Sequence, residues 1–267
     1  MGHWYEKDGT PQHFLGPNGS GTTLRQARAQ HKKGNTLYPS VTTIGNVRAK
    51  PALTNWLQEQ AALEAVTDSC LEDYRQNGFD YKAWAKRVVQ SARDKTFAKA
   101  DEGSDIHDIL ERWLDGDESM DSESKVLCTR VFDVIFTHCG NPDWITEQSF
   151  ANTELGYAGR CDLHSDDWVI DFKTKDGDVS GVRGYKEQAE QLAAYAHGLG
   201  IPNARTANVF ISRDRALWGK PEGVKFFEHK DDNAWNRFYH TLLLWSVDNK
   251  YGPLWDKLQN GLEPVAK

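Results

Sequence analysis

The chain of 267 residues is poor in cysteine and has no long apolar run. Its four cysteines, Cys70, Cys128, Cys139 and Cys161, are widely spaced and form no CxxC pair, which argues against a zinc ribbon or a disulfide framework and fits a reducing compartment. No stretch approaches the roughly 20 apolar residues of a membrane span. The first residues, MGHWYEKDGT, lack the layout of a secretory signal. We therefore expect a cytoplasmic protein that does not bind a membrane.

Acidic residues are missing from one part of the chain and crowded in another. No Asp or Glu occurs between Gly9 and Gln58, a segment that carries six Lys and Arg residues. From Asp101 to Lys125 there are ten acidic and two basic residues, and since the whole chain has a net charge of −7, the remainder is close to neutral. A basic N-terminal segment is compatible with binding a polyanion near a metal site. Ordinary solvated surface charge is the alternative.

Apolar periodicity predicts a mixed α/β chain of helices, a strand cluster, a crossover helix, a further strand and a closing helix. Pro51 suits the first turn of a helix. The predicted elements are a short hairpin and loop over the first 35 residues, an extended stretch from Pro39, helices over 54–115 interrupted near Gln76–Gly78, a helix over 124–139, a strand over 144–152, an antiparallel pair within 156–175, a helix over 186–199, a strand over 207–213 and a helix over 233–247.

The stretch WVIDFKTK, residues 168–175, ends an apolar strand on an acid and a base. Strand side chains alternate between faces, so Asp171 and Lys173 point the same way and Phe172 points into the core. Asp162 lies on the preceding strand, and a turn at Ser165–Asp167 would bring it beside Asp171. Two adjacent carboxylates repel each other unless a cation or a proton lies between them. This arrangement suits Mg²⁺ or Mn²⁺ with a lysine beside it, although a surface cross-strand ion pair is the alternative.

Two further groups lie at helical spacing on either side of this hairpin. Upstream, EGSDIHDILERWL places His107 and Glu111 on one helix face. Downstream, Gln191 and Tyr195 share a polar helix face and could together reach a lysine amine or a phosphate. A structural histidine and a solvated polar face are the alternatives.

The order of these motifs resembles the RecB/Cas4-like branch of the PD-(D/E)XK nucleases. The matching blocks are GSDIH (103–107), GRCD (159–162), IDFKT (170–174) and QLAAY (191–195). The N-terminal segments HWYEKDG, TTLRQAR and YPSVTTIGNVRAKPALTNW are similar to those of phage-encoded exonucleases related to mitochondrial genome maintenance exonucleases. The resemblance implies a restriction-endonuclease-like core, a mixed central sheet flanked by helices, with a helical N-terminal elaboration. We predict a single nuclease domain over 1–267, with a basic helical part over 1–100, a catalytic core over 101–215 and a helical closure over 216–267.

The resemblance also implies roles for individual residues in a metal-dependent DNA exonuclease. His107, Asp162 and Asp171 would hold Mg²⁺ or Mn²⁺, with the Phe172 carbonyl as a further ligand, and Lys173 would orient or activate the attacking water. Several relatives keep an acid at the position of Glu147. The remaining implied roles are support of Lys173 and contact with the DNA backbone by Gln191 and Tyr195, and contact with phosphates by Ser40, Thr42 and Thr43.

The family pattern is not matched everywhere. Cys161 stands at the position of the proline in the family name, and Asp171 replaces the frequent Glu. Because no cysteine follows Cys161, we predict no iron–sulfur cluster. The expected partner is DNA, at ends or as single strands, together with phage recombination proteins, in the host cytoplasm.

Three other functions remain open from the sequence. A structure-specific endonuclease of the same fold would use the same residues. A catalytically inactive DNA-binding module would be expected to lose some of them. A carboxylate-pair glycosidase would act without metal and would leave Lys173 and the Gln191–Tyr195 pair unexplained.

Overall fold

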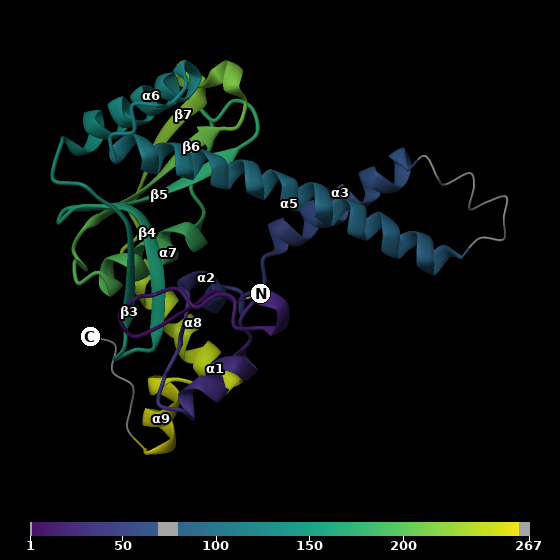
Figure 1. The fold of residues 1–267 in the computed structure, drawn as a ribbon, viewed down its shortest axis with the longest axis vertical. Helices are drawn as coiled ribbons and strands as arrows, with labels where there is room; N and C mark the ends of the chain where they lie inside the picture. Colours follow the sequence, from purple (N-terminus) through teal and green to yellow (C-terminus); the bar gives the residue numbers. More distant parts are fainter. Residues whose placement is uncertain (1, 69–79, 262–267) are drawn as a thin grey trace. The chain divides into compact units, whose positions relative to one another are not determined.

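The structure, a computed structural model, describes residues 2–68 and 80–261 and contains a mixed α/β fold (Figure 1). The helices are α1 Leu24–His31, α2 Val41–Gly45, α3 Pro51–Thr67, α5 Tyr81–Leu114, α6 Ser122–Cys139, α7 Lys186–Gly198, α8 Ala234–Asn249 and α9 Pro253–Gln259. The strands are β1 Trp4–Tyr5, β2 Tyr38–Pro39, β3 Ile145–Asn152, β4 Tyr157–His164, β5 Trp168–Lys175, β6 Arg205–Ser212 and β7 Val224–His229. None of the helices in the described ranges combines the length and apolar character that crossing a membrane requires.

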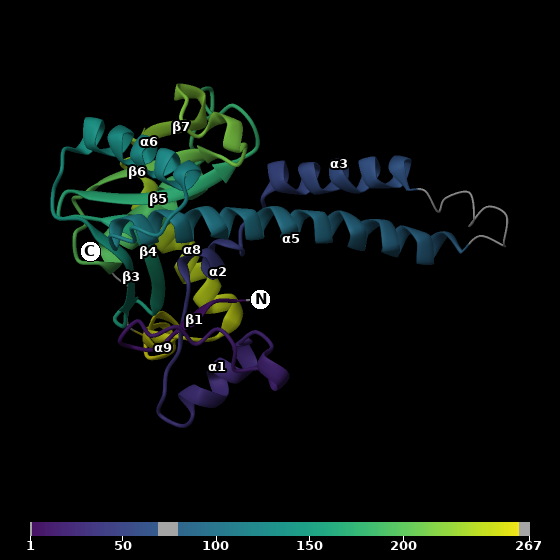
Figure 2. The same cartoon turned by 45° about the horizontal axis from the view of Figure 1, so that its top comes forward.

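The chain divides into two compact units, one of Met1–Arg48 with His107–Lys267 and one of Ala49–Ile106. In the second unit, α3 and the first part of α5 lie side by side as an antiparallel pair (Figure 2). The Ser91 hydroxyl of α5 donates to Glu64 of α3 over 2.7 Å. α3 begins at Pro51, as the sequence predicts.

The first unit is built on a five-stranded sheet in the order β3-β4-β5-β6-β7. β5 and β6 are parallel and are joined through α7, whereas the other neighbours are antiparallel. Alternate residues of β5 face opposite sides of the sheet. The row of Phe172, Val209 and Phe226 faces α6, whose His138 stacks on Phe226 with ring centroids 4.4 Å apart. The row of Asp171 and Asn208 faces α7, so the polar side chains of β5 lie under that helix.

The side of the sheet that faces α7 is covered by an extensive apolar core. α7 packs on the strands and α8 packs on α7, and both helices add buried side chains to a cluster that also includes residues of β1, α1, α2 and the strands. The largest fully buried members include Tyr157, Leu192 and Leu242. This core fixes α7 against β5 and thereby sets the position of the polar residues between them.

Both ladders of β4 are interrupted at Asp162. The ladder with β3 skips this residue, and the ladder with β5 ends before it. The pairs Thr146↔Leu163 and Gln148↔Cys161 of β3 and β4 leave Glu147 opposite Asp162 without a ladder pair. β4 and β5 pair at Leu163↔Ile170 and His164↔Val169, and the pairing stops before Asp162 and Asp171. Three carboxylates on three neighbouring strands therefore lie at the point where the sheet opens.

Comparison with the sequence analysis confirms the predicted mixed sheet flanked by helices, the antiparallel pair turning at Ser165–Asp167, and the helices α6, α7 and α8. The predicted hairpin near the N-terminus is reduced to a single bridge between Tyr5 and Pro11. The predicted interruption near Gln76–Gly78 lies outside the described residues. α1, β7 and α9 were not predicted.

The prediction of an extended stretch after Pro39 is wrong. Residues 41–45 form the short helix α2, because the Ser40 hydroxyl accepts a hydrogen bond from the Thr43 amide over 3.0 Å and caps the first turn. The β-branched run VTTI favours a strand locally, but the cap and the burial of Val41 and Ile44 in the core decide for the helix.

Candidate functional site

Asp171 lies at the centre of a dense hydrogen-bond network on β5. Its side chain is buried, and its Oδ2 lies 2.5 Å from the Nζ of Lys173. Gln191 of α7 donates to Oδ1 over 3.0 Å, and Asn208 of β6 donates to Oδ2 over 2.7 Å. We call these four residues the Asp171 network. Its donors neutralise and orient one buried carboxylate, a condition that burial of a charge requires.

Asn208 is a member of this network that sequence reasoning missed. It is fully buried on β6, directly beside Asp171 in the parallel register. Its amide nitrogen also donates to the Asp171 carbonyl over 3.1 Å, which fixes the orientation of the amide group. The Asn208 oxygen therefore accepts from the Nε2 of His229, at 2.7 Å. His229 lies on β7, so the network extends across three strands.

Gln191 and Tyr195 come together as the four-residue spacing predicts. The Gln191 amide nitrogen donates to the Tyr195 hydroxyl over 2.8 Å as well as to Asp171. Tyr195 is 6% exposed and belongs to the apolar core. A side chain so buried offers little surface to a phosphate, so we assign Tyr195 the role of holding Gln191 in place.

Lys173 is the cation of the site. Burial alone would lower the pKa of its amine, but the carboxylates of Asp171 and Asp162 outweigh burial and raise that pKa. The amine is therefore charged in the metal-free protein at neutral pH. Its side chain is 30% exposed, whereas that of Asp171 is 4% exposed, so the amine can meet a molecule from solvent while the carboxylate stays covered.

Asp162 faces the opening between β4 and β5. Its Oδ2 accepts the backbone amide of Phe172 over 2.7 Å, which replaces a ladder hydrogen bond by a side-chain one. The same oxygen lies 3.6 Å from the Nδ1 of His107. Burial, and then the nearby charge of Asp171, raise the pKa of Asp162. The Asp162 carboxylate thus lies close to other acids and has few donors of its own.

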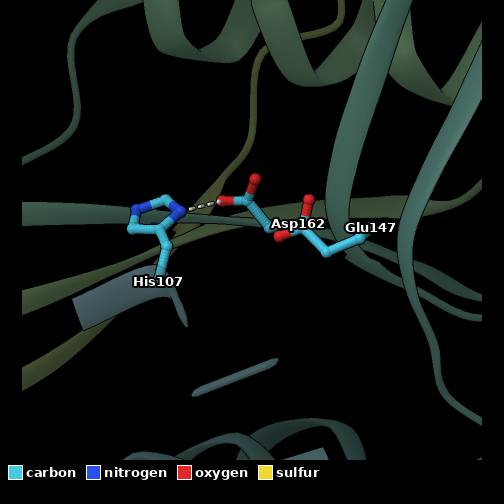
Figure 3. Close-up of side chains that lie close together, drawn as sticks. All are labelled: His107, Glu147 and Asp162. Carbon is cyan, nitrogen blue, oxygen red and sulfur yellow. Dashed lines mark ion pairs between the residues drawn. The ribbon is translucent and has the colours of Figure 1, made fainter. Parts of the chain in front are cut away.

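Glu147 joins Asp162 and His107 in a group that could hold a metal ion. One ligand atom of each residue lies within 4.8 Å of those of the other two. Figure 3 shows the His107 ring directed at the Asp162 carboxylate, with the Glu147 carboxylate on the other side of Asp162. We call this group the carboxylate–histidine cluster (His107, Glu147 and Asp162). Imidazole and carboxylate ligands suit divalent metals such as Mg²⁺, Mn²⁺ or Zn²⁺.

The backbone of Glu147 has an unusual conformation. Its φ of 49° lies in the left-handed region, which costs a non-glycine residue energy and is enriched at functional sites. Burial, and then the charge of Asp162, raise the pKa of Glu147 to about 7, although Arg160 forms an ion pair with it. A divalent cation between Glu147 and Asp162 would relieve this repulsion.

The structure brings together most of the predicted site residues and separates others. His107 and Asp162 lie in the carboxylate–histidine cluster, and Asp171, Lys173 and Gln191 lie in the Asp171 network beside it. Asp171 was predicted as a metal ligand, but it is not among the three residues of the cluster. Its carboxylate accepts hydrogen bonds from Gln191 and Asn208 and pairs with Lys173.

The three predicted phosphate-binding residues of the N-terminal segment have different surroundings. Ser40 is 4% exposed and its hydroxyl is hydrogen-bonded to Thr43. Thr43 also accepts the backbone amide of His3 over 3.0 Å. Thr42 is exposed. Capping of α2 therefore accounts for Ser40, Thr43 is half-buried, and Thr42 is the most exposed of the three.

Gly159, in the GRCD block, is explained by packing. A Cβ atom at this position would lie 2.8 Å from the Tyr195 ring and 2.9 Å from the Phe150 ring. Any larger residue would force the Tyr195 or the Phe150 ring to shift. The glycine therefore lets both rings pack against β4.

Known proteins offer one weak structural likeness to this chain. No family model matches the chain, and no curated protein matches it significantly. The chain is similar to the crystal structure of SSO0001, with 17% identity, over 74% of this chain and 88% of that one, at a TM-score of 0.34. A likeness at that level carries no argument, so the interpretation of the site rests on its own geometry.

Proposed function

We propose that the protein is a Mg²⁺- or Mn²⁺-dependent deoxyribonuclease with a PD-(D/E)XK core of the RecB/Cas4-like branch, and that it acts as an exonuclease. The observation that carries the proposal is the charged, partly exposed Lys173 held by the buried Asp171 beside the carboxylate–histidine cluster. Hydrolysis of a phosphodiester needs charge neutralised at phosphorus, a positioned water and an exit for the leaving oxygen. The two groups of residues divide these tasks.

The carboxylate–histidine cluster fits a divalent cation by its donor set and by its excess of negative charge. His107, Glu147 and Asp162 would hold the ion, which when bound would polarise the phosphate and lower the pKa of water. Without such an ion, burial and then the charge of a neighbouring carboxylate raise both pKa values, with Asp162 acting on Glu147 and Asp171 acting on Asp162. The chemistry of the residues present therefore fits the metal that the family resemblance implies.

Lys173 would orient the attacking water and stabilise the charge that develops on the phosphate. In the reaction, the water oxygen bonds to phosphorus, the bond from phosphorus to one ester oxygen breaks, and that oxygen leaves with a proton. Asp171 keeps the amine in place, and Gln191 and Asn208 keep Asp171 in place. Fixed charges of this kind stabilise a transition state because they need no reorganisation during the reaction.

A time course with end-labelled DNA tests the proposal. Linear and circular substrates, single- and double-stranded, are incubated with Mg²⁺, Mn²⁺ or EDTA. We expect metal-dependent loss of linear DNA and survival of circles. Lys173→Ala and Asp171→Ala should abolish cleavage. Lys220→Ala and Asp248→Asn, which change exposed residues in other parts of the chain, should leave cleavage unchanged.

Two other outcomes would each indicate a different function. Cleavage of circles at internal positions would identify a structure-specific endonuclease of the same fold. Intact DNA that nevertheless shifts on a gel would identify a DNA-binding module without catalysis, and the proposal of an enzyme would be wrong. Phage DNA processing or recombination, with recombination proteins as partners, is the biological setting that we propose for the exonuclease.

A further inference from the structure

A second feature that could bind DNA lies next to Lys173 on β5. Lys175 is two residues further along the strand, so it lies on the same face as Asp171 and Lys173 and roughly 7 Å beyond Lys173. Its Nζ lies 5.6 Å from the ring centroid of Tyr185, the residue that precedes α7. Tyr185 is 57% exposed, so a large part of its side chain is open to solvent.

The backbone that carries this exposed ring is well anchored. In the connection from β5 to α7, Val179 is fully buried and its amide donates to the Glu222 carbonyl over 2.8 Å. Gly184 lies so close to β7 that a Cβ atom would approach His229 to 2.4 Å. The Tyr185 amide donates to the Gln188 side chain over 2.8 Å. The backbone at Tyr185 is therefore fixed, while the side chain stays open to solvent.

Two further cations lie near Lys175. Burial, and then the charges of Arg213 and Lys173, lower the pKa of its amine, while Asp176 opposes them. Asp176 is shared, because it also forms an ion pair with Arg213. Lys173 is likewise paired with Asp171, and the charge of Lys175 would attract an anion such as a phosphate.

We propose that Lys175 and Tyr185 bind the nucleotide next to the scissile phosphate, with Lys175 on its phosphate and Tyr185 stacked on its base. This inference rests on the proposed nuclease function and names its substrate, a DNA strand whose base at this position is unpaired. A base inside a duplex has both faces covered by its neighbours, whereas an unpaired base can stack on an exposed ring. The lysine amine can bind the phosphate of such a nucleotide while the nearby aromatic ring stacks on its base.

The test measures binding of the full-length protein to fluorescent single-stranded oligonucleotides by anisotropy. Ca²⁺ replaces Mg²⁺, and a gel confirms that the DNA stays intact. We expect Tyr185→Ala to bind about tenfold more weakly, because one stacked base is lost, and Tyr185→Phe to bind like wild type. Lys175→Ala should make the plot of log affinity against log salt shallower by about 0.7, the value for one phosphate contact on a single strand. Lys220→Ala should leave the salt plot unchanged.

A second measurement locates the nucleotide. Oligonucleotides with one abasic residue, placed at each position in turn, should reveal one position at which wild type binds more weakly. Tyr185→Ala should bind that oligonucleotide and the intact one equally well, because the ring that read the base is gone.

The outcomes separate this inference from the proposed function. If wild type binds and cleaves single strands and Tyr185→Ala has the same affinity and the same response to abasic residues, the nucleotide site is wrong and the nuclease stands. If wild type binds duplexes but no single strands, the inference is also wrong. If wild type neither binds nor cleaves any DNA, both proposals fall.

Discussion

Asp162 and Asp171 lie opposite each other on neighbouring strands, yet their surroundings differ. Asp171 receives hydrogen bonds from Gln191 and Asn208 and pairs with Lys173. Asp162 accepts one backbone amide and lies beside Glu147 and His107, with its pKa raised. Side-chain donors of the protein thus satisfy the carboxylate of Asp171. The carboxylate of Asp162 keeps lone pairs that could bind a cation. We therefore expect the cation to bind on the side of Asp162.

The largest effect is expected on that side. Asp162→Asn should reduce DNA cleavage at least about 100-fold, as removal of a catalytic group commonly does, and should weaken Mg²⁺ binding in calorimetry. The asparagine oxygen can still accept the Phe172 amide, so the thermal midpoint should not fall. Asp248→Asn is the matched control. Undiminished cleavage by Asp162→Asn would show that Asp162 is no ligand.

The next largest effect is expected in the pH dependence of stability, to which the crowded carboxylates near Asp162 should contribute. Burial and Asp162 raise the pKa of Glu147 from 4.5 to about 7. The folded protein then holds a proton that the unfolded chain has released, so the free energy of unfolding falls as pH rises through this window. We expect a loss of at most about 3 kcal/mol in EDTA, measured by urea titration at several pH values.

Two changes should reduce this pH dependence. Glu147→Gln abolishes one titrating group, and the loss between pH 4.5 and about 7 should shrink to the part that the raised pKa of Asp162 contributes. Saturating Mg²⁺ should stabilise the folded state increasingly as the carboxylates ionise, because it binds that state alone. A stability that rises over the same interval in EDTA would contradict the described crowding of carboxylates.

On the side of Asp171, Asn208→Ala should have an intermediate effect. It removes two hydrogen bonds to Asp171, and residues that orient catalytic groups commonly contribute 10- to 100-fold to activity. We expect a loss in kcat of that size with little change in KM. Asn203→Ala, at an exposed turn, is the control. A variant with full kcat would show that Lys173 and Gln191 suffice to hold Asp171.

The smallest effect is expected from Tyr195→Phe. This substitution leaves one N–H of Gln191 without its acceptor, which costs about 1 kcal/mol. The kcat for DNA cleavage should fall a few-fold while KM for DNA stays constant. A large rise in KM would instead indicate that Tyr195 contacts the substrate, as the sequence analysis predicted.

The sequence predicts those parts of the site that depend on local order. Strand alternation and a short turn place Asp171 and Lys173 on one face, and helical spacing places Gln191 beside Tyr195. Asn208 and His229 were missed because their strands, β6 and β7, carry no recognisable motif. Their role comes from the register between strands, which single-sequence patterns do not encode.

The N-terminal part illustrates a different difficulty. Thr23 caps α1 and Ser40 caps α2, and both signals lie within Gly-rich or β-branched surroundings that favour loops or strands. Packing of Ala27 and Ile44 into the core overrides these local preferences. The fold class follows from the pattern of strands and long helices, but such short helices depend on tertiary contacts.

The left-handed backbone of Glu147 has a practical consequence for protein engineering. Glycine adopts this conformation readily, so Glu147→Gly should relieve strain of about 1 kcal/mol and at the same time delete a carboxylate from the carboxylate–histidine cluster. A variant that gains stability while it loses cleavage activity is well suited to capturing DNA in a complex that cannot react. Glu147→Ala, with the same deletion but no relief, would show how much of the gain belongs to the backbone.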